Sequence, residues 1–231
     1  MSADPNFLLI RNYDLWNHLS DDEYNELAIQ HCYIEAPKGK YIYFEAFNLN
    51  KLYFLKKGYI RIGYIDEAGK EVIKEILQKG EIFGQFTLEK NNLLGEFAQA
   101  YKEDVSLCAF NIHDFEQLLK KKPEINLKFS RQLGNKLYKI QNRLENLLHK
   151  DIRTRLVDFL LSISPQQENL HDKVSFINYL THEDISHLIG SSRQTVTTAI
   201  NDLIKAGLLQ FSRTEIIITS VKELKKQRTV I

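Results

Sequence analysis

The feature that most constrains the fold is a change of hydrophobic pattern near residue 111. Residues 38–110 contain short runs of aromatic and β-branched residues separated by turn residues, which is typical of β-strands. After residues 111–113 the apolar residues recur at helical spacing, and Pro123 stands at the first turn of a long predicted helix. The chain is therefore predicted to be an α+β protein, with an all-β part followed by a helical part.

The all-β part is predicted to form a closed or two-layered sheet. The turn Asp66–Lys70 places Gly69 where a hairpin needs a positive φ. Short strands at this spacing indicate a barrel or sandwich. The strands are expected at residues 52–55, 59–65, 71–77, 98–101 and 105–110. The aromatic residues expected in the core are Tyr41, Tyr43, Phe44, Phe47, Tyr53 and Phe54, which could instead line a pocket for an apolar small molecule.

The long helix carries a narrow apolar seam whose residues are spaced four and three apart. The seam consists of Leu133, Leu137, Ile140, Leu144 and Leu147. This spacing is typical of a two-helix coiled coil. The seam could also pack against the helix's own domain, but its polar, basic flanks favour a parallel homodimer.

Charge is distributed unevenly along the chain. Residues 1–119 carry 12 Lys and Arg against 19 Asp and Glu, whereas residues 120–150 carry 9 against 2. The basic segment is either a solvated helix face or a contact with a polyanion, and charge alone does not decide between them.

The C-terminal part has the pattern of a helix-turn-helix. Asp151 is expected to cap one helix, and Thr181, with an acid three residues later, to cap another. Gly190 ends that helix, and a second amphipathic helix is predicted from about residue 193 to 206, before Gly207. Residues 208–211 and 215–219 are predicted to form a two-stranded wing.

The outer face of the second helix carries the side chains suited to reading DNA. Arg193 can form two hydrogen bonds with guanine, and Gln194 can do the same with adenine. Hydroxyl groups and the helix N-terminus suit phosphate oxygens. The alternative, an ordinary solvated face, does not account for cap, turn, helix and wing together. The predicted DNA contacts are Ser192, Arg193, Gln194, Thr197, Thr198, Asn201, Thr181 and Arg213.

These motifs resemble those of the Crp/Fnr-family transcription regulators. The recognition element of that family is similar to Ile189–Val196, and its β-roll to Gly58, the turn at Asp66–Lys70 and Gly80–Gly84. The resemblance implies a β-roll or jelly-roll sensor domain resembling a cyclic-nucleotide-binding domain (residues 1–122), a dimerisation helix (123–150) and a winged helix-turn-helix domain (151–231).

The resemblance also implies that three positions read bases: Arg193, Gln194 and Thr198. Gln194 stands where many members carry Glu, and Thr198 replaces a second Arg found in some members. The half-site should therefore differ from that of the cyclic-AMP-responsive members.

Binding of cyclic AMP is not expected. Gln85 stands where nucleotide-binding members carry a ribose-binding Glu, and their Arg-Ser pair falls near Leu94 and Gly95. Without a guanidinium the site loses a two-pronged phosphate contact, and Glu96 adds a negative charge beside it. The positions implied for an effector pocket are Gly84, Gln85, Phe86, Leu94, Gly95, Glu96, Ile140 and Gln141, the last two facing the base.

Iron–sulfur clusters and haem need Cys or His residues as protein ligands, so the number and spacing of these residues indicate which cofactor the chain could bind. Cys32 and Cys108 are two thiols, too few for an iron–sulfur cluster or a disulfide framework. Haem needs only one His, but the seven histidines include no pair at metal-binding helix spacing. The effector therefore remains unknown, and an apolar small molecule or no effector at all stays open.

The remaining expectations concern class and location. Membrane insertion is not expected because no apolar run reaches about 18 residues, and the two cysteines fit a cytoplasmic protein. No catalytic motif is present, so an enzyme is not expected. The predicted partners are a near-palindromic double-stranded DNA site, a second copy of the chain and RNA polymerase. The alternative is an effector-binding sensor or scaffold whose DNA binding is weak or lost.

Overall fold

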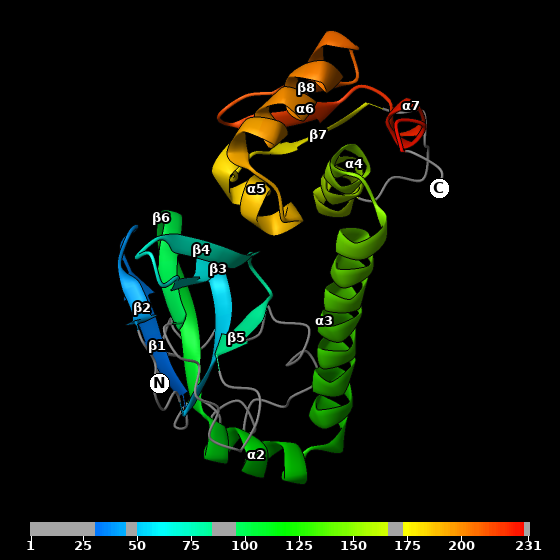
Figure 1. Ribbon diagram of the computed structural model, residues 1–231. Helices are drawn as coiled ribbons and strands as arrows, with labels where there is room; N and C mark the ends of the chain where they lie inside the picture. Colours follow the sequence, from blue (N-terminus) through cyan, green and yellow to red (C-terminus); the bar gives the residue numbers. More distant parts are fainter. Residues whose placement is uncertain (1–30, 45–49, 85–95, 166–172, 229–231) are drawn as a thin grey trace. The chain divides into compact units, whose positions relative to one another are not determined.

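The structure, a computed structural model, describes residues 31–44, 50–84, 96–165 and 173–228. Figure 1 shows the order of its elements. The chain divides into two compact units, residues 1–135 and 136–231, and the division falls within one long helix. Strands lie in the first unit and a helix-rich module in the second, which confirms the α+β class.

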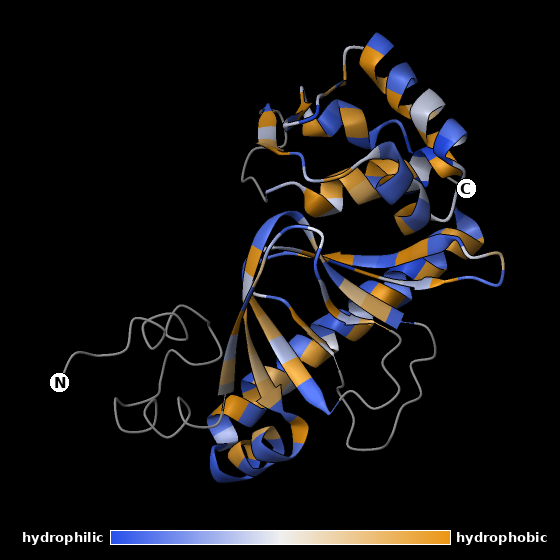
Figure 2. Ribbon diagram, turned by 90° about the vertical axis from the view of Figure 1, so that its left-hand side faces the viewer, coloured by the Kyte–Doolittle hydropathy of each residue, from blue (hydrophilic) through white to orange (hydrophobic). Residues whose placement is uncertain are grey.

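The N-terminal unit is built on a six-stranded antiparallel sheet. Two long strands, β3 and β6, pair along most of their length, with β1 beyond β6 and β4 beyond β3. Short strands β2 and β5 pair with β6 and β3. Figure 2 shows hydrophobic and hydrophilic residues alternating along these strands. Their bounds are β1 His31–Ala36, β2 Tyr41–Phe44, β3 Lys51–Ile65, β4 Glu71–Leu77, β5 Ile82–Gly84 and β6 Glu96–Asn111.

Two predicted pairs of short strands are single strands in the structure. The pairing of β3 with β6 continues across register shifts between Leu55 and Tyr59, so the Lys-Lys-Gly segment interrupts the register without ending the strand. Gly58 lies there with φ 83°, and a Cβ would come within 2.8 Å of the Asp104 carbonyl oxygen. The turn predicted at Asp66–Lys70 is confirmed, with Gly69 at φ 78° and strand β4 beginning at Glu71.

The core of the N-terminal unit consists of two clusters of buried side chains. One lies between the sheet and the following helices and contains Leu52, Phe54, Ile82, Cys108, Phe110, Phe115, Leu118, Ile125 and Phe129. The other fills the sheet interior. Of the aromatics expected in the core, Tyr43, Tyr53 and Phe54 are buried, whereas Tyr41 and Phe44 are 37% and 45% exposed. The prediction was wrong for these two, which lie on the edge strand β2, and Phe47 lies outside the described residues.

Two helices follow the sheet. Asn111 caps α2 (Ile112–Lys121) by accepting a hydrogen bond from the His113 backbone N–H. Helix α3 (Pro123–His149) begins at the predicted proline and is 27 residues long. Ile125 and Phe129 bury its first turns in the core of the N-terminal unit.

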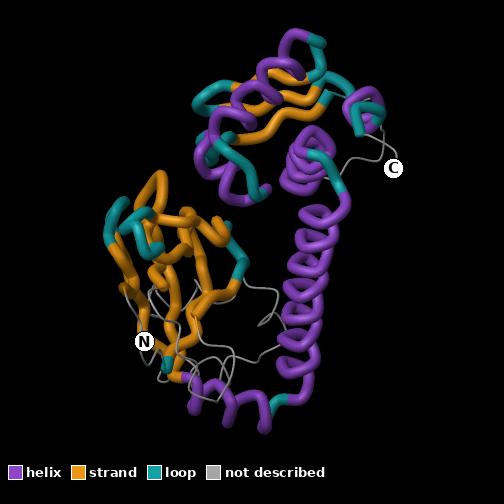
Figure 3. The backbone as a smooth tube through the Cα atoms, in the orientation of Figure 1, coloured by secondary structure: helices purple, strands orange, loops and turns teal. Residues whose placement is uncertain are grey.

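Besides the second half of α3, the described part of the C-terminal unit contains helices α4 to α7 and a small sheet. Figure 3 shows this sheet beside its helices. The predicted two-stranded wing was incomplete, because β7 joins it in the order β7-β9-β8. Strand β7 pairs with a segment about forty residues later, which no local pattern reveals. The bounds are α4 Ile152–Ile163, β7 Val174–Ile177, α5 His182–Ile189, α6 Arg193–Lys205, β8 Leu209–Phe211, β9 Glu215–Ile218 and α7 Val221–Lys225.

Within the described ranges, no helix is both long and apolar enough to cross a membrane. The predicted division of the chain into three parts, with boundaries at residues 122 and 150, stays a prediction. The division into two compact units falls at a different place, inside α3.

Candidate nucleic-acid interface

Helix α5 begins with a complete capping box. The Asp184 backbone N–H donates to Thr181 Oγ1 at 3.1 Å, and the Thr181 backbone N–H donates to Asp184 Oδ2 at 2.7 Å. Asp184 is buried, so its carboxylate is held by this reciprocal pair and not by solvent. The predicted start of the helix at Thr181 is thereby confirmed.

The turn between α5 and α6 depends on Gly190. Its φ of 63° and ψ of 56° lie in the left-handed region, where glycine is favoured. A Cβ at this position would come within 2.5 Å of Leu147 Cδ2, so the end of α3 packs directly against the turn. Two arginines hold the same place: Arg155 Nη1 donates to the Ile189 carbonyl oxygen at 2.6 Å, and Arg143 Nη2 to that of His187 at 3.0 Å. These guanidinium groups add hydrogen-bond donors to the carbonyl oxygens at the end of α5, where the helix itself supplies few.

Helix α6 presents two contrasting faces. Val196, Ile200 and Leu203 are at most 1% exposed and fix the helix on its unit. The opposite face carries the predicted base-reading residues Arg193 and Gln194 in its first turn, both exposed. Ser192 caps the helix by accepting from the Thr195 backbone N–H at 3.1 Å. The remaining predicted DNA contacts on this face, Thr198 and Asn201, are also exposed.

Thr197 differs from its neighbours because its hydroxyl group is already engaged. It donates to the Arg193 carbonyl oxygen at 2.9 Å and lies 2.9 Å from His182 Nδ1. Burial, followed by the charge of Arg193, lowers the pKa of His182, so this imidazole is neutral at pH 7. The sequence did not predict that His182 contacts helix α6. The contact joins His182 to Thr197, fifteen positions later, and no local sequence pattern indicates such a pair.

The Arg193 guanidinium is held loosely before any contact with DNA. Its Nη1 lies 3.8 Å from Glu183 Oε2, and the two side chains are 71% and 42% exposed. An exposed pair of this length contributes little to stability. The guanidinium is therefore free to exchange Glu183 for a base edge.

Two predicted DNA contacts lie outside α6. Thr181 is exposed at the start of α5, and Arg213 is exposed in the turn between β8 and β9. Ser212 orders that turn, because its hydroxyl oxygen accepts from the Glu215 backbone N–H at 2.9 Å. The structure thus places Arg213 at the tip of the wing.

The residues implied for an effector pocket are divided between the two units or lie outside the described residues. Gln85, Phe86, Leu94 and Gly95 lie outside the described residues. Gly84 ends β5 and Glu96 begins β6, both in the N-terminal unit, while Ile140 and Gln141 are exposed on α3 in the C-terminal unit.

Glu96 is more strongly neutralised than the sequence suggested. Tyr43 donates its hydroxyl hydrogen to Glu96 Oε1 at 3.0 Å, and Lys74 Nζ lies 2.9 Å from Oε2. Burial, reinforced by Glu96, raises the pKa of Tyr43, which keeps this phenol protonated. The repulsion expected between Glu96 and a phosphate is therefore smaller than the sequence implies.

Most of the apolar seam is uncovered in a single chain. Leu137, Ile140 and Leu144 are 56–57% exposed, and Leu147 is 40% exposed. Leu133 alone packs partly against the core cluster of the N-terminal unit. Exposed leucines in a continuous row on one helix indicate a missing partner surface.

His, Cys, Asp and Glu side chains are the candidate metal ligands in the described part of the chain. No group of three or more His, Cys, Asp or Glu side chains lies close enough there to hold a metal ion. Cys32 is exposed and Cys108 is buried, and burial raises the pKa of the Cys108 thiol to about 11. Such a thiol is a poor source of the thiolate that metals require.

Comparison with known proteins gives matches to both parts of the chain. A pattern described as a cyclic nucleotide-binding domain matches residues 33–122, and one described as a Crp-like helix-turn-helix domain matches residues 154–227. Together they span the sheet of the N-terminal unit and the candidate DNA-reading module.

Full-length relatives support the same assignment. The chain is 29% identical to a global nitrogen regulator of Nostoc over 83% of its own length and 87% of that protein's. It is 28% identical to the cAMP-activated global transcriptional regulator CRP of Pasteurella multocida, over 74% and 82%. Among solved structures, a CooA mutant from Carboxydothermus hydrogenoformans shares the fold with a TM-score of 0.74 and 24% identity, over 94% of both chains.

Proposed function

The chain belongs to the Crp/Fnr family of transcription regulators, and from that premise we propose that it acts as a dimer on a near-palindromic DNA site. The family consists of DNA-binding regulators and not of enzymes, and its members are typically dimers. The observation that carries the proposal is the exposed first turn of α6, mounted on a buried apolar face.

Each chain supplies one reading helix. We infer that Arg193 and Gln194 contact base edges in the major groove, and that Thr198 lies one turn further along the same face. Ser192, Asn201, Thr181 and Arg213 are suited to phosphates because they surround this face or lie on the wing. Thr197 is better described as a positioning residue, since its hydroxyl group joins His182 to α6.

Pairing along the apolar seam sets the spacing of the two reading helices. Two helix-turn-helix units in a symmetric dimer contact successive major grooves about 34 Å apart. The half-sites should therefore be inverted repeats separated by about one turn of DNA.

Arg193→Ala tests base reading by α6. A two-pronged contact with guanine is worth about 1–3 kcal/mol, so affinity for the specific site should fall by that amount, with a much smaller loss on random DNA. Gel-shift titration on both DNAs measures the difference. Lys205→Ala, an exposed cation at the end of α6, is the matched control. Equal losses on both DNAs would assign Arg193 to a phosphate.

Cyclic AMP should not bind at micromolar concentration. Residues 84–98 contain no arginine, and the segment therefore lacks the guanidinium that would grip the cyclic phosphate. The cAMP-activated relative shares only 28% identity, which does not transfer the ligand. Isothermal titration calorimetry should give no measurable heat, and a dissociation constant near 1 μM would contradict the proposal.

A further inference from the structure

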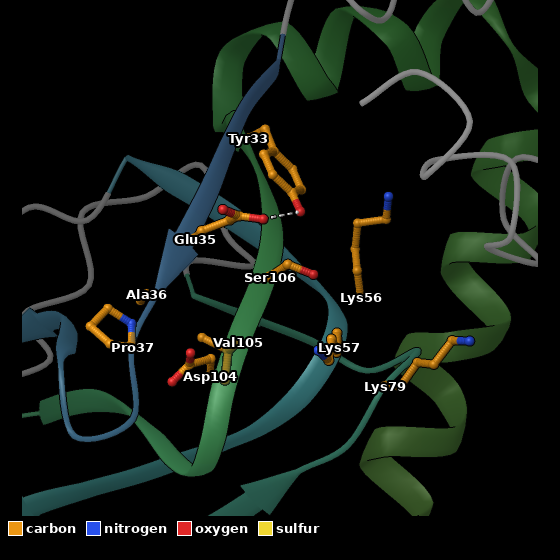
Figure 4. Close-up of a pocket in the computed structure, with 10 residues that line it drawn as sticks. All are labelled: Tyr33, Glu35, Ala36, Pro37, Lys56, Lys57, Lys79, Asp104, Val105 and Ser106. Atoms are coloured by element: carbon orange, nitrogen blue, oxygen red, sulfur yellow. Dashed lines mark hydrogen bonds between the residues drawn. The ribbon is translucent and has the colours of Figure 1, made fainter. Parts of the chain in front are cut away.

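A cavity of about 550 Å³ in the N-terminal unit is lined by residues of the neighbouring strands β1, β6 and β3 and of the segments beside them. Figure 4 shows the side chains that line it. We call it the lysine pocket; its lining residues are Tyr33, Glu35, Ala36, Pro37, Lys56, Lys57, Lys79, Asp104, Val105 and Ser106. A volume of this size accommodates a small organic molecule.

Lys56 is the unusual member of the pocket. The residue is only 8% exposed, yet its Nζ has no hydrogen-bond partner within the described structure. The ammonium group lies 5.9 Å from the centre of the Tyr33 ring, which offers a weak cation–π contact. Burial lowers the pKa of Lys56 because the charged form loses hydration. A buried, unpaired ammonium is costly, and an anion beside it would remove that cost.

The other charges around the pocket also favour an anion. Lys57 and Lys79 are exposed and contribute two more ammonium groups to its lining. Each of the two carboxylates of the pocket accepts a hydrogen bond from another residue. Glu35 Oε1 accepts from the Tyr33 hydroxyl at 3.0 Å, and Asp104 Oδ1 accepts from the Lys38 backbone N–H at 2.9 Å. The acids are therefore directed to these donors, while the Lys56 ammonium lacks a partner.

The remaining lining offers little apolar surface. Ala36 and Val105 are each 2% exposed and belong to the core of the sheet, Pro37 is exposed, and Ser106 adds a hydroxyl group. We propose that the lysine pocket binds a small organic anion whose carboxylate contacts Lys56 beside Tyr33 and Ser106, while Lys57 and Lys79 add positive charge around it (Figure 4).

The lysine pocket is lined by other residues than those implied to hold a cyclic nucleotide. None of its lining residues falls within residues 84–98, where the family's phosphate contacts are expected. All ten lining residues belong to the N-terminal unit, whereas α6 belongs to the C-terminal unit. Anion binding in the lysine pocket can therefore be tested independently of DNA binding by α6.

Benzoate and its neutral counterpart benzamide provide matched probes. Backbone amide NMR spectra of the full chain should show benzoate shifting signals of residues 33–37, 56–57 and 104–106, with benzamide at the same concentration leaving them unchanged. Equal responses to the two probes, or no response at these amides, would overturn the proposal.

Variants test which lysine makes the contact. Lys56→Met should weaken benzoate binding by about tenfold or more, since a hydrogen bond to a charged group is lost. Lys51→Met, an exposed lysine on the same strand β3, should leave it unchanged. Lys79→Met, at an exposed position, should weaken it several-fold. Equal benzoate affinity in the Lys56, Lys79 and Lys51 variants would show that the pocket lysines do not hold the anion.

Discussion

Replacing Leu144 by Glu should convert the proposed dimer into a monomer and lower affinity for a two-half-site operator by more than about 100-fold. Leu144 is 56% exposed in a single chain, so the substitution leaves the fold of each chain intact. In a parallel pair the two glutamates would face each other across the symmetry axis, where like charges repel and lose hydration. The loss on DNA is large because each reading helix then binds alone.

Sedimentation velocity and gel shift measure the two effects. Asn135→Glu adds the same charge at an exposed position of α3 that points away from the apolar seam, and should change neither result. A Leu144→Glu protein that still sediments as a dimer would place the dimer contact elsewhere.

Phe115→Ala should produce the largest loss of stability in the N-terminal unit, about 3–5 kcal/mol. Phe115 is 1% exposed, and its ring lies within 6 Å of three others, namely Phe54, Phe110 and Phe129. These rings come from β3, β6 and α3, so the cavity left by Phe115 would loosen the attachment of both helices to the sheet.

Amide hydrogen exchange can assign this loss to one unit of the intact chain. Protection should fall in β3 and β6, while α5 and α6 keep theirs, and Phe115→Leu should show a smaller loss because it leaves a smaller cavity. Equal loss of protection in both units would contradict a local role for Phe115.

Local signals explain why the helix-turn-helix could be predicted so closely. Thr181 and Asp184 lie three residues apart and form the capping box directly, and Gly190 ends the helix through its own backbone conformation. The long helix begins at Pro123 for the same reason, since a proline suits the first turn.

Features that depend on distant parts of the chain could not be predicted. Strand β7 needs β9 as its partner, and Arg155 reaches carbonyl oxygens more than thirty residues away. The sequence Lys56-Lys57 is that of an exposed turn, but the register shift in β3 buries the first lysine and leaves the second exposed. Whether a lysine is buried depends on the tertiary fold. The lysine pocket could therefore not be predicted from the sequence pattern.

Selection of DNA from a random pool by the purified protein tests the central claim most directly. The account predicts enrichment of inverted repeats whose half-sites lie about one helical turn apart, and loss of that enrichment with Arg193→Ala. Recovery of no preferred sequence, or of single half-sites bound by one chain, would contradict it.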